Sequence, residues 1–337
     1  MLKRLTIAAL LLTSAAFAPA ATAQDAPGAY GPMLEGFNYP YTVDRYNFMS
    51  QGADLTMAYM DVKPDRPNGR TVVLMHGKNF CAATWGGTMA SLLDAGYRVI
   101  AVDQIGFCKS SKPQNYNFTF AQLASNTHDL LKSVGVTRAT IMGHSMGGML
   151  AMRYALTYPA DTEQLVLVGP LGLEDWRAKG VPEVSYDTLY QDQLKTTDAS
   201  IRAYEQATYY AGEWKPEYEP PVQMLAGMYR GPGKEIVAKN SAQTYQMIFS
   251  QPVLAELPNL KIPVLLIIGD KDTSAPGKQY APPDVRPKLG NYPVLAKEAA
   301  ARIPNAKLVE FPDLGHAPQI QAPGRFYRTL LDGLAKP

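Results

Sequence analysis

The stretch GHSMG at residues 143–147 decides the fold, because it sets a serine between two glycines at a turn from a predicted strand to a predicted helix. Residues 140–143 before it form a short apolar run, and residues 146–158 after it have helical spacing that Pro159 stops. A nucleophile needs a sharp turn of this kind to project its hydroxyl, and the glycines give the backbone room to pack. An ordinary glycine-rich turn is the alternative, but the strand-turn-helix context favours a nucleophilic Ser145.

Around this turn, continuous apolar runs alternate with helical patterns. Such runs are typical of strands that are buried on both faces of a parallel sheet, and their alternation with helices predicts a doubly wound α/β fold. Residues 46–48 and 55–62 could add an antiparallel hairpin at the edge of the sheet. The predicted strands are 71–75, 98–103, 140–143, 164–169, 262–269 and 306–311, and the predicted helices are 84–93, 119–134, 146–158 and 323–334.

The alternation is interrupted after Pro170. Residues 171–250 contain no obvious buried strand, but they hold 8 of the 20 tyrosines together with Trp176 and Trp214. The strand pattern then returns at residue 262. We therefore expect one large α/β domain formed by residues 24–170 and 251–337, with residues 171–250 as an insertion.

Composition excludes several classes of protein. With 46% hydrophobic and 18% charged residues in 337, the chain is not disordered. The 32 basic and 30 acidic residues are dispersed, so there is no basic patch of the kind that binds nucleic acid. Two cysteines and four histidines are too few for a structural zinc cluster or a multi-histidine metal site. We expect neither a metal nor an organic cofactor, and oligomeric state is not readable.

The amino terminus has the pattern of a secretory signal peptide. Lys3 and Arg4 precede an uncharged apolar or small run at residues 5–18, and small residues follow up to Ala23. The run is short for a membrane anchor, so we expect cleavage after Ala23, a periplasmic or secreted location, and no membrane span in the mature chain. Removal of residues 1–23 would take the formal charge from +2 to zero.

A serine nucleophile needs a general base and an acid that orients the base. Of the four histidines, His316 is the best candidate, because it follows the last predicted strand, at the carboxyl end of the sheet where open α/β sheets place their sites. The strand at 262–269 is followed by Asp270 and Asp272, and Asp272 lies further into the loop, which suits contact with a histidine. Ser145, Asp272 and His316 follow one another in the order expected of hydrolases whose serine lies on a G-x-S-x-G turn.

Acyl transfer also needs hydrogen-bond donors for a developing oxyanion. The backbone N–H of Met146 directly follows the nucleophile and is the first expected donor. The second should come from the loop after the strand at 71–75, and we assign it to the backbone N–H of Lys78, with Asn79 as the local alternative.

The chain resembles the α/β-hydrolases that carry a cap, a group of serine esterases, lactonases, C–C hydrolases and proline iminopeptidases. The resemblance lies in HG at 76–77, Asp103 with Gly106 and Ser110, GHSMG at 143–147, GDKD at 269–272 and GH at 315–316. It implies a mostly parallel sheet of about eight strands flanked by helices, and it implies that residues 171–250 form a helical cap, or lid, over the site. It implies acyl hydrolysis in general but names no substrate.

Departures from the family pattern narrow the choice. The early turn reads HGKN at 76–79 and lacks the HGGP of proline iminopeptidases, which makes peptidase activity less expected. Ser145 occupies the position where haloalkane dehalogenases and epoxide hydrolases carry aspartate, which argues against both of these activities. Residues 274–293, between Asp272 and His316, contain five prolines, and this stretch is either an ordered loop at the rim of the site or a surface insertion.

The resemblance also bears on the two cysteines. Cys81 follows the oxyanion loop, Cys108 follows the next strand, and in the family these two strands are neighbours. A Cys81–Cys108 disulfide is therefore expected in an oxidising compartment, with two buried free thiols as the alternative.

The expected function is hydrolysis of a carboxylic ester, or of a related small acyl substrate, by Ser145, His316 and Asp272. Amide or iminopeptide cleavage, or lactone opening, by the same residues is the first alternative. A non-catalytic binding protein on the same scaffold is the second, and a complete set of three residues argues against it.

Overall fold

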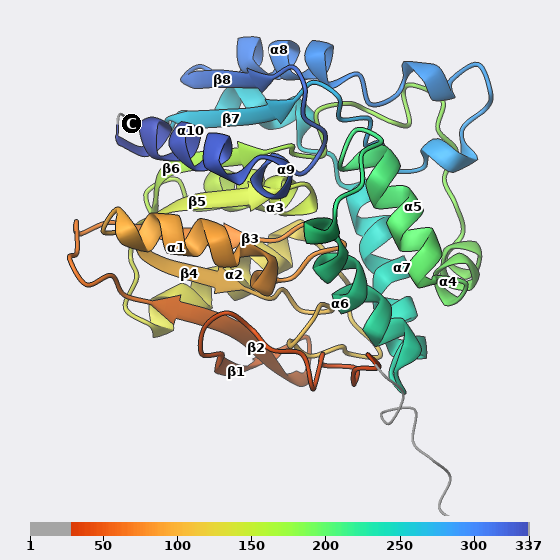
Figure 1. Cartoon of the computed structure of the whole chain (residues 1–337), viewed down its shortest axis with the longest axis horizontal. Helices are drawn as coiled ribbons and strands as arrows, with labels where there is room; N and C mark the ends of the chain where they lie inside the picture. Colours follow the sequence, from red (N-terminus) through yellow and green to blue (C-terminus); the bar gives the residue numbers. More distant parts are fainter. Residues whose placement is uncertain (1–27, 336–337) are drawn as a thin grey trace, which may run out of the picture.

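The computed structural model describes residues 28–335, so the predicted signal peptide lies outside the described residues. In this part of the chain, eight strands form one sheet in the order β1-β2-β4-β3-β5-β6-β7-β8 (Figure 1). β1 (Asp44–Ser50) and β2 (Ala53–Val62) form an antiparallel hairpin that joins β4 (Arg98–Val102), also antiparallel. All other neighbouring strands are parallel, which confirms the predicted α/β sheet and its edge hairpin.

The inner parallel strands are mostly apolar in sequence because both faces of the sheet are covered. In β3 (Thr71–Met75), Val73 and Met75 pack into one hydrophobic cluster, whereas Val72 and Leu74 pack into another on the opposite face. Successive side chains of a strand point to opposite faces, so a strand in such a sheet needs apolar residues at most positions. The remaining strands are β5 (Ala139–His144), β6 (Thr162–Val168), β7 (Val264–Gly269) and β8 (Ala306–Phe311).

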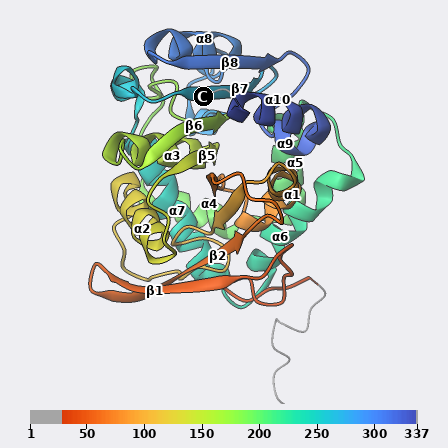
Figure 2. The ribbon, with the colours of Figure 1, turned by 90° about the vertical axis from the view of Figure 1, so that its left-hand side faces the viewer.

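Helices cover the two faces of the sheet (Figure 2). One face packs against α1 (Gly86–Asp94) and α10 (Pro323–Ala335), and the other against α2 (Phe120–Ser133), α3 (Met146–Thr157) and α8 (Tyr292–Arg302). In α10, the side chains of Phe326, Leu330 and Leu334 recur every four residues and are fully buried, so one stripe of the helix faces the sheet.

Four helices occupy the chain between β6 and β7. They are α4 (Tyr186–Leu194), α5 (Asp198–Thr208), α6 (Glu219–Arg230) and α7 (Lys234–Ser250). They stand together beside one end of the sheet, and not over either of its faces (Figure 1). Within the described residues, none of the helices is both long and apolar enough to cross a membrane.

The sequence analysis did not predict one helix of the sheet layer, α8. This helix begins at the end of the proline-rich stretch 274–293 and continues to Arg302. Pro293 is compatible with α8 because it is the second residue of the helix, where its missing N–H has no intrahelical acceptor to lose.

Candidate active site

Ser145 sits on the turn between β5 and α3 with a backbone that few side chains tolerate. Its φ and ψ are 58° and −121°, in the positive-φ region that L residues rarely adopt. The turn is held because the Ser145 N–H donates to the carbonyl oxygen of Val168 at 3.1 Å. A Cβ at Gly143 would lie 2.0 Å from the carbonyl oxygen of Gly147, and one at Gly147 would lie 2.2 Å from that of Met75. Both glycines are therefore needed where the sequence has them.

The structure brings His316 and Asp272 into direct contact. The Nδ1 atom of His316 lies 2.6 Å from Oδ2 of Asp272, and both residues are buried. A carboxylate only accepts, so Nδ1 carries the proton and Nε2 is left free to accept one. The other carboxylate oxygen, Oδ1, accepts the N–H of Ser274 at 2.8 Å, which fixes the orientation of Asp272. Asp270 makes no hydrogen bond to His316, so the structure favours Asp272 over its neighbour.

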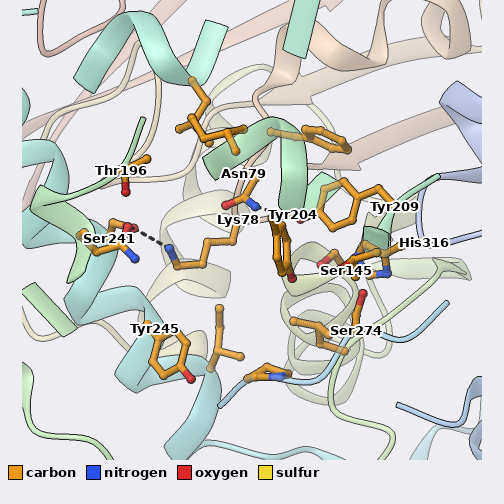
Figure 3. A pocket seen from close by; sticks show the side chains of 18 of the residues that line it. Lys78, Asn79, Ser145, Thr196, Tyr204, Tyr209, Ser241, Tyr245, Ser274 and His316 are labelled. Atoms are coloured by element: carbon orange, nitrogen blue, oxygen red, sulfur yellow. Dashed lines mark hydrogen bonds between the residues drawn. The ribbon is translucent and has the colours of Figure 1, made fainter. Parts of the chain in front are cut away.

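His316 and Ser145 line the same cavity, and in the view of Figure 3 both appear toward the same end of it. Gly169 leaves room for this arrangement, because a Cβ there would lie 2.9 Å from the carbonyl oxygen of His316 and 3.5 Å from Oδ2 of Asp272. Ser145 is thus brought near Asp272 and His316, which lie more than 120 positions later in the sequence. The three residues follow β5, β7 and β8 at the carboxyl ends of these strands.

His144 supports the backbone of His316 and does not compete with it as a base. Its Nε2 donates to the carbonyl oxygen of His316 at 2.9 Å, and the two rings lie 4.8 Å apart. Burial holds the pKa of His144 well below its usual range, so the ring is neutral. His128 lies elsewhere: it contacts Asp161 at 2.8 Å and stacks on Tyr158.

The loop after β3 passes directly against Ser145. A Cβ at Gly77 would lie 3.0 Å from Cβ of Ser145, so only a glycine allows this approach. The ring of His76 holds the loop: its Nδ1 donates to the Gly77 carbonyl oxygen at 2.8 Å, and its Nε2 accepts the N–H of Gln104 at 3.1 Å. Burial lowers the pKa of His76, which keeps the ring neutral, as these two bonds require.

The two predicted oxyanion donors lie on this loop and at the start of α3. Met146 is the first residue of α3, where a backbone N–H has no intrahelical acceptor. The N–H of Lys78 has no hydrogen-bond acceptor among the described residues. The backbone N–H of Asn79, the local alternative, likewise has no acceptor among the described residues. Its side chain donates from Nδ2 to the hydroxyl of Tyr209 at 3.0 Å.

A disulfide joins Cys81 to Cys108, as predicted, with a separation of 27 residues along the sequence. It ties the end of the oxyanion loop to the loop after β4. Asp103 adds to this link, since its Oδ1 accepts the N–H of Ala82 at 2.8 Å and its Oδ2 accepts the N–H of Lys109 at 3.1 Å. Cys81, Asp103 and Cys108 are close enough to hold a metal ion, but both sulfurs are already bonded to each other.

The cavity has a volume of about 660 Å³, within the range of small-molecule sites. Its floor is formed by loops at the carboxyl ends of the strands, and helices α4–α7 form its roof. Residues 273–279 form part of the wall, so the proline-rich stretch is an ordered loop at the rim of the site. Figure 3 labels ten of the lining residues: Lys78, Asn79, Ser145, Thr196, Tyr204, Tyr209, Ser241, Tyr245, Ser274 and His316.

The tyrosines of the insertion differ in what they contact. Tyr210 and Tyr218 stack at 3.8 Å between ring centres, in a hydrophobic cluster that also includes Tyr209 and residues outside the insertion. Four tyrosines line the cavity, namely Tyr204, Tyr209, Tyr229 and Tyr245. Tyr209, whose ring lies 4.8 Å from that of His316, is a site residue that sequence reasoning did not single out.

The chain belongs to the α/β-hydrolase fold family, whose sequence profile matches residues 70–323. It is 62% identical to a probable hydrolytic enzyme of known structure from Pseudomonas aeruginosa PAO1, with a TM-score of 0.90 over 91% of this chain and 98% of that one. It is 30% identical to Lipase 1 of Psychrobacter immobilis over 67% of this chain and 65% of the lipase. It is also 28% identical to a 2-hydroxy-6-oxononadienedioate/2-hydroxy-6-oxononatrienedioate hydrolase of Comamonas testosteroni, over 80% and 90% of the two chains.

Proposed function

We propose that the protein is a serine hydrolase that cleaves carboxylic esters through an acyl-enzyme. The observation that carries the proposal is geometric. A serine on a strained strand-to-helix turn opens into the same cavity as a histidine whose other ring nitrogen is held by a buried carboxylate. This is the arrangement that turns a weakly nucleophilic hydroxyl into an effective one.

In the proposed reaction, Oγ of Ser145 attacks the ester carbonyl while Nε2 of His316 takes the serine proton. His316 then gives this proton to the leaving alcohol. Asp272 holds the ring through Nδ1 and stabilises its charged form. The backbone N–H groups of Lys78 and Met146 stabilise the oxyanion. Water, activated by the same histidine, releases the acid from Ser145.

Two further observations support parts of this proposal. A lipase is an ester-cleaving enzyme, and the similarity to Lipase 1 of Psychrobacter immobilis favours esters over amides. The disulfide fits an oxidising compartment, which supports our proposal that residues 1–23 direct export to the periplasm or the medium.

The test is hydrolysis of p-nitrophenyl butyrate by the wild type and by Ser145→Ala. We expect the substitution to lower kcat by at least about 1,000-fold. Ser274→Ala is the matched control, because this serine lies in the same cavity wall but not on the strained turn. It should stay within about tenfold of the wild type. Substantial activity in a folded Ser145→Ala protein would contradict the assignment.

The bond type is tested with a panel of p-nitrophenyl esters, amino-acid anilides and lactones. We expect the esters to give the largest kcat/KM. A preference for anilides or lactones would keep the three residues in their roles and change the substrate class. A folded wild-type protein that neither turns over the panel nor reacts at Ser145 with a fluorophosphonate would instead indicate a binding protein.

A further inference from the structure

The charged residues that line the cavity all have the same sign. Four basic side chains contribute to its walls, whereas the described lining residues include no aspartate or glutamate. The net charge of residues 24–337 does not explain this bias, since their acidic and basic residues are equal in number. The bias is therefore local to the cavity. The four basic residues are Lys78, Lys112, Lys278 and Arg286.

Three of these four cations are bound to backbone carbonyl groups near them in the sequence. Nζ of Lys112 donates to the carbonyl oxygen of Cys108 at 2.6 Å, and Nζ of Lys278 donates to that of Leu289 at 3.1 Å. Arg286 donates to the carbonyl oxygen of Ala281 at 2.9 Å. These contacts brace the loops at the rim and give each cation a structural role.

Lys78 is different, because its side chain makes neither an ion pair nor a bond to a carbonyl group among the described residues. Its Nζ contacts the hydroxyl oxygen of Ser241, on α7, at 2.5 Å. An ammonium group has three N–H donors, so this contact leaves two of them unused. Figure 3 shows the side chain extending through the cavity from the oxyanion loop toward Ser241.

The groups around the ammonium are neutral and already fixed in orientation. Ser241 donates its hydroxyl proton to Oε1 of Gln193 at 2.7 Å, and Tyr229 donates to the same oxygen at 2.8 Å. Since the proton of Ser241 is committed to Gln193, its oxygen is available to accept from Lys78. The network holds the ammonium in place but supplies no negative charge.

This environment is costly for a cation and favourable for an anion. Burial lowers the pKa of Lys78 to about 8, and no nearby carboxylate offsets the effect. A carboxylate that entered the cavity would pair with the ammonium in a partly enclosed site, and a charge-assisted hydrogen bond there is stronger than one in water. One ammonium matches one negative charge, which favours a carboxylate over a doubly charged phosphate.

The direction of the side chain places this carboxylate on the acyl part of the substrate. His316 delivers its proton to the leaving alcohol, so the alcohol must lie on the His316 side of Ser145. In Figure 3, Lys78 and Ser241 lie on the other side of Ser145 from His316. The acyl chain, which stays bound to Ser145, therefore extends toward the ammonium.

We propose that Lys78 is a specificity-determining residue that binds a terminal carboxylate on the acyl chain of the substrate, with Ser241 positioning its ammonium. The substrates would then be monoesters of dicarboxylic acids. This inference rests on the proposed ester hydrolysis and narrows it to a substrate class.

The test compares two esters that differ in one terminal group. Mono-p-nitrophenyl adipate carries a carboxylate, and the p-nitrophenyl ester of adipic acid monoamide carries a neutral amide of the same shape. The readout is the ratio of their kcat/KM values, because a general effect on the oxyanion loop cancels in a ratio. We expect the wild type to prefer the carboxylate by about 10- to 100-fold.

Lys78→Met should bring this ratio close to one, and Lys78→Gln serves as a second variant if the first does not fold. Lys278→Met is the matched control: it removes one positive charge from the same cavity but leaves Lys78 in place, so the ratio should persist. The inference is overturned if the wild type shows no preference, if both Lys78 variants keep it, or if Lys278→Met loses it equally.

The ratio should also fall as pH rises through about 8. The kcat/KM value reports ionisation of the free enzyme, in which Lys78 loses its charge near this pH. Lys112 loses its charge earlier, because burial lowers its pKa to about 7, whereas burial raises the pKa values of Tyr229 and Tyr245 and keeps both neutral. In Lys78→Met, the decline near pH 8 should be absent.

Failure of this inference can be distinguished from failure of the proposed function. Hydrolysis of the amide ester by the wild type but not by Ser145→Ala would support the serine mechanism even without a carboxylate preference. If neither ester is cleaved, the mechanism fails. Binding of mono-p-nitrophenyl adipate and of the amide ester to Ser145→Ala then tests carboxylate recognition alone, and equal affinities would overturn it.

Discussion

Glu205, in the inserted helix α5, offers a test of how burial affects the ionisation of a carboxyl group in this protein. Its side chain is fully buried; Oε1 has no hydrogen-bond partner among the described residues, and Oε2 is 3.5 Å from the hydroxyl of Tyr210. Burial raises the pKa of this carboxyl group to about 8. The group is therefore protonated in the folded protein at neutral pH, and we expect Glu205→Gln, which mimics the neutral form, to be tolerated.

The sign of the pH effect follows from the two protonation states. Below about pH 4 the carboxyl is protonated in both the folded and the unfolded chain, and its ionisation has no effect on stability. Between about pH 4.5 and 8, the unfolded chain ionises while the folded chain does not, so the wild type loses stability as pH rises. From pH 5 to pH 8 this loss is on the order of 3 to 4 kcal/mol for a folded-state pKa of about 8.

The assay is urea unfolding followed by tryptophan fluorescence, without reductant, at several pH values between 5 and 9. Glu205→Gln should gain stability relative to the wild type as pH rises, whereas Glu217→Gln, at an exposed site, should show no such trend. Replacing the carboxyl group by an amide also changes the free energy of unfolding by an amount that does not depend on pH. The test is therefore how the difference between the two proteins changes with pH. A difference between wild type and Glu205→Gln that stays constant from pH 5 to pH 9 would refute the reasoning.

Two further predictions concern the oxyanion loop and the serine turn. The double variant Cys81→Ala/Cys108→Ala should lose about 3 to 4 kcal/mol of unfolding free energy, from the chain entropy of the loop closed by the 27-residue separation. Urea unfolding with and without dithiothreitol measures this, and equal stability of the oxidised wild type and the variant would contradict it. Gly147→Ala should cost at least about 3 kcal/mol, because its Cβ would lie 2.2 Å from the carbonyl oxygen of Met75. Gly324→Ala, whose nearest neighbour is 3.9 Å away, is the control in thermal unfolding by circular dichroism.

The sequence was informative about the sheet because a buried strand can be recognised from its own run of apolar residues. Strands covered on both faces are apolar at most positions, and each parallel strand of the structure overlaps a predicted strand. β8, at the edge of the sheet, is less apolar and has Lys307 exposed. The sequence indicates the helix α8 less clearly than the strands. Prolines suggest a loop whatever their position, and the sequence does not show that Pro293 occupies the second residue of a helix.

The roof of the cavity was the least predictable part. The tyrosines at 204, 209, 229 and 245 line the cavity, whereas those at 210 and 218 do not, and nothing in their spacing distinguishes the residues that reach the cavity. Which side chain faces the cavity depends on how α4–α7 pack against one another and against the loops of the sheet. That packing is set by contacts between residues far apart in the sequence.

The sequence by itself determined the class of fold, the serine turn and the order of the three predicted catalytic residues. It did so because a strained turn needs glycines at fixed positions, and because open α/β sheets place their sites in loops at the carboxyl ends of the strands. Only the tertiary structure decided that Asp272 and not Asp270 contacts His316, that Cys81 and Cys108 are joined, and that Lys78 extends toward Ser241. Each of these outcomes depends on the direction of a side chain within a loop, and that direction is fixed by neighbours which the chain brings together only on folding.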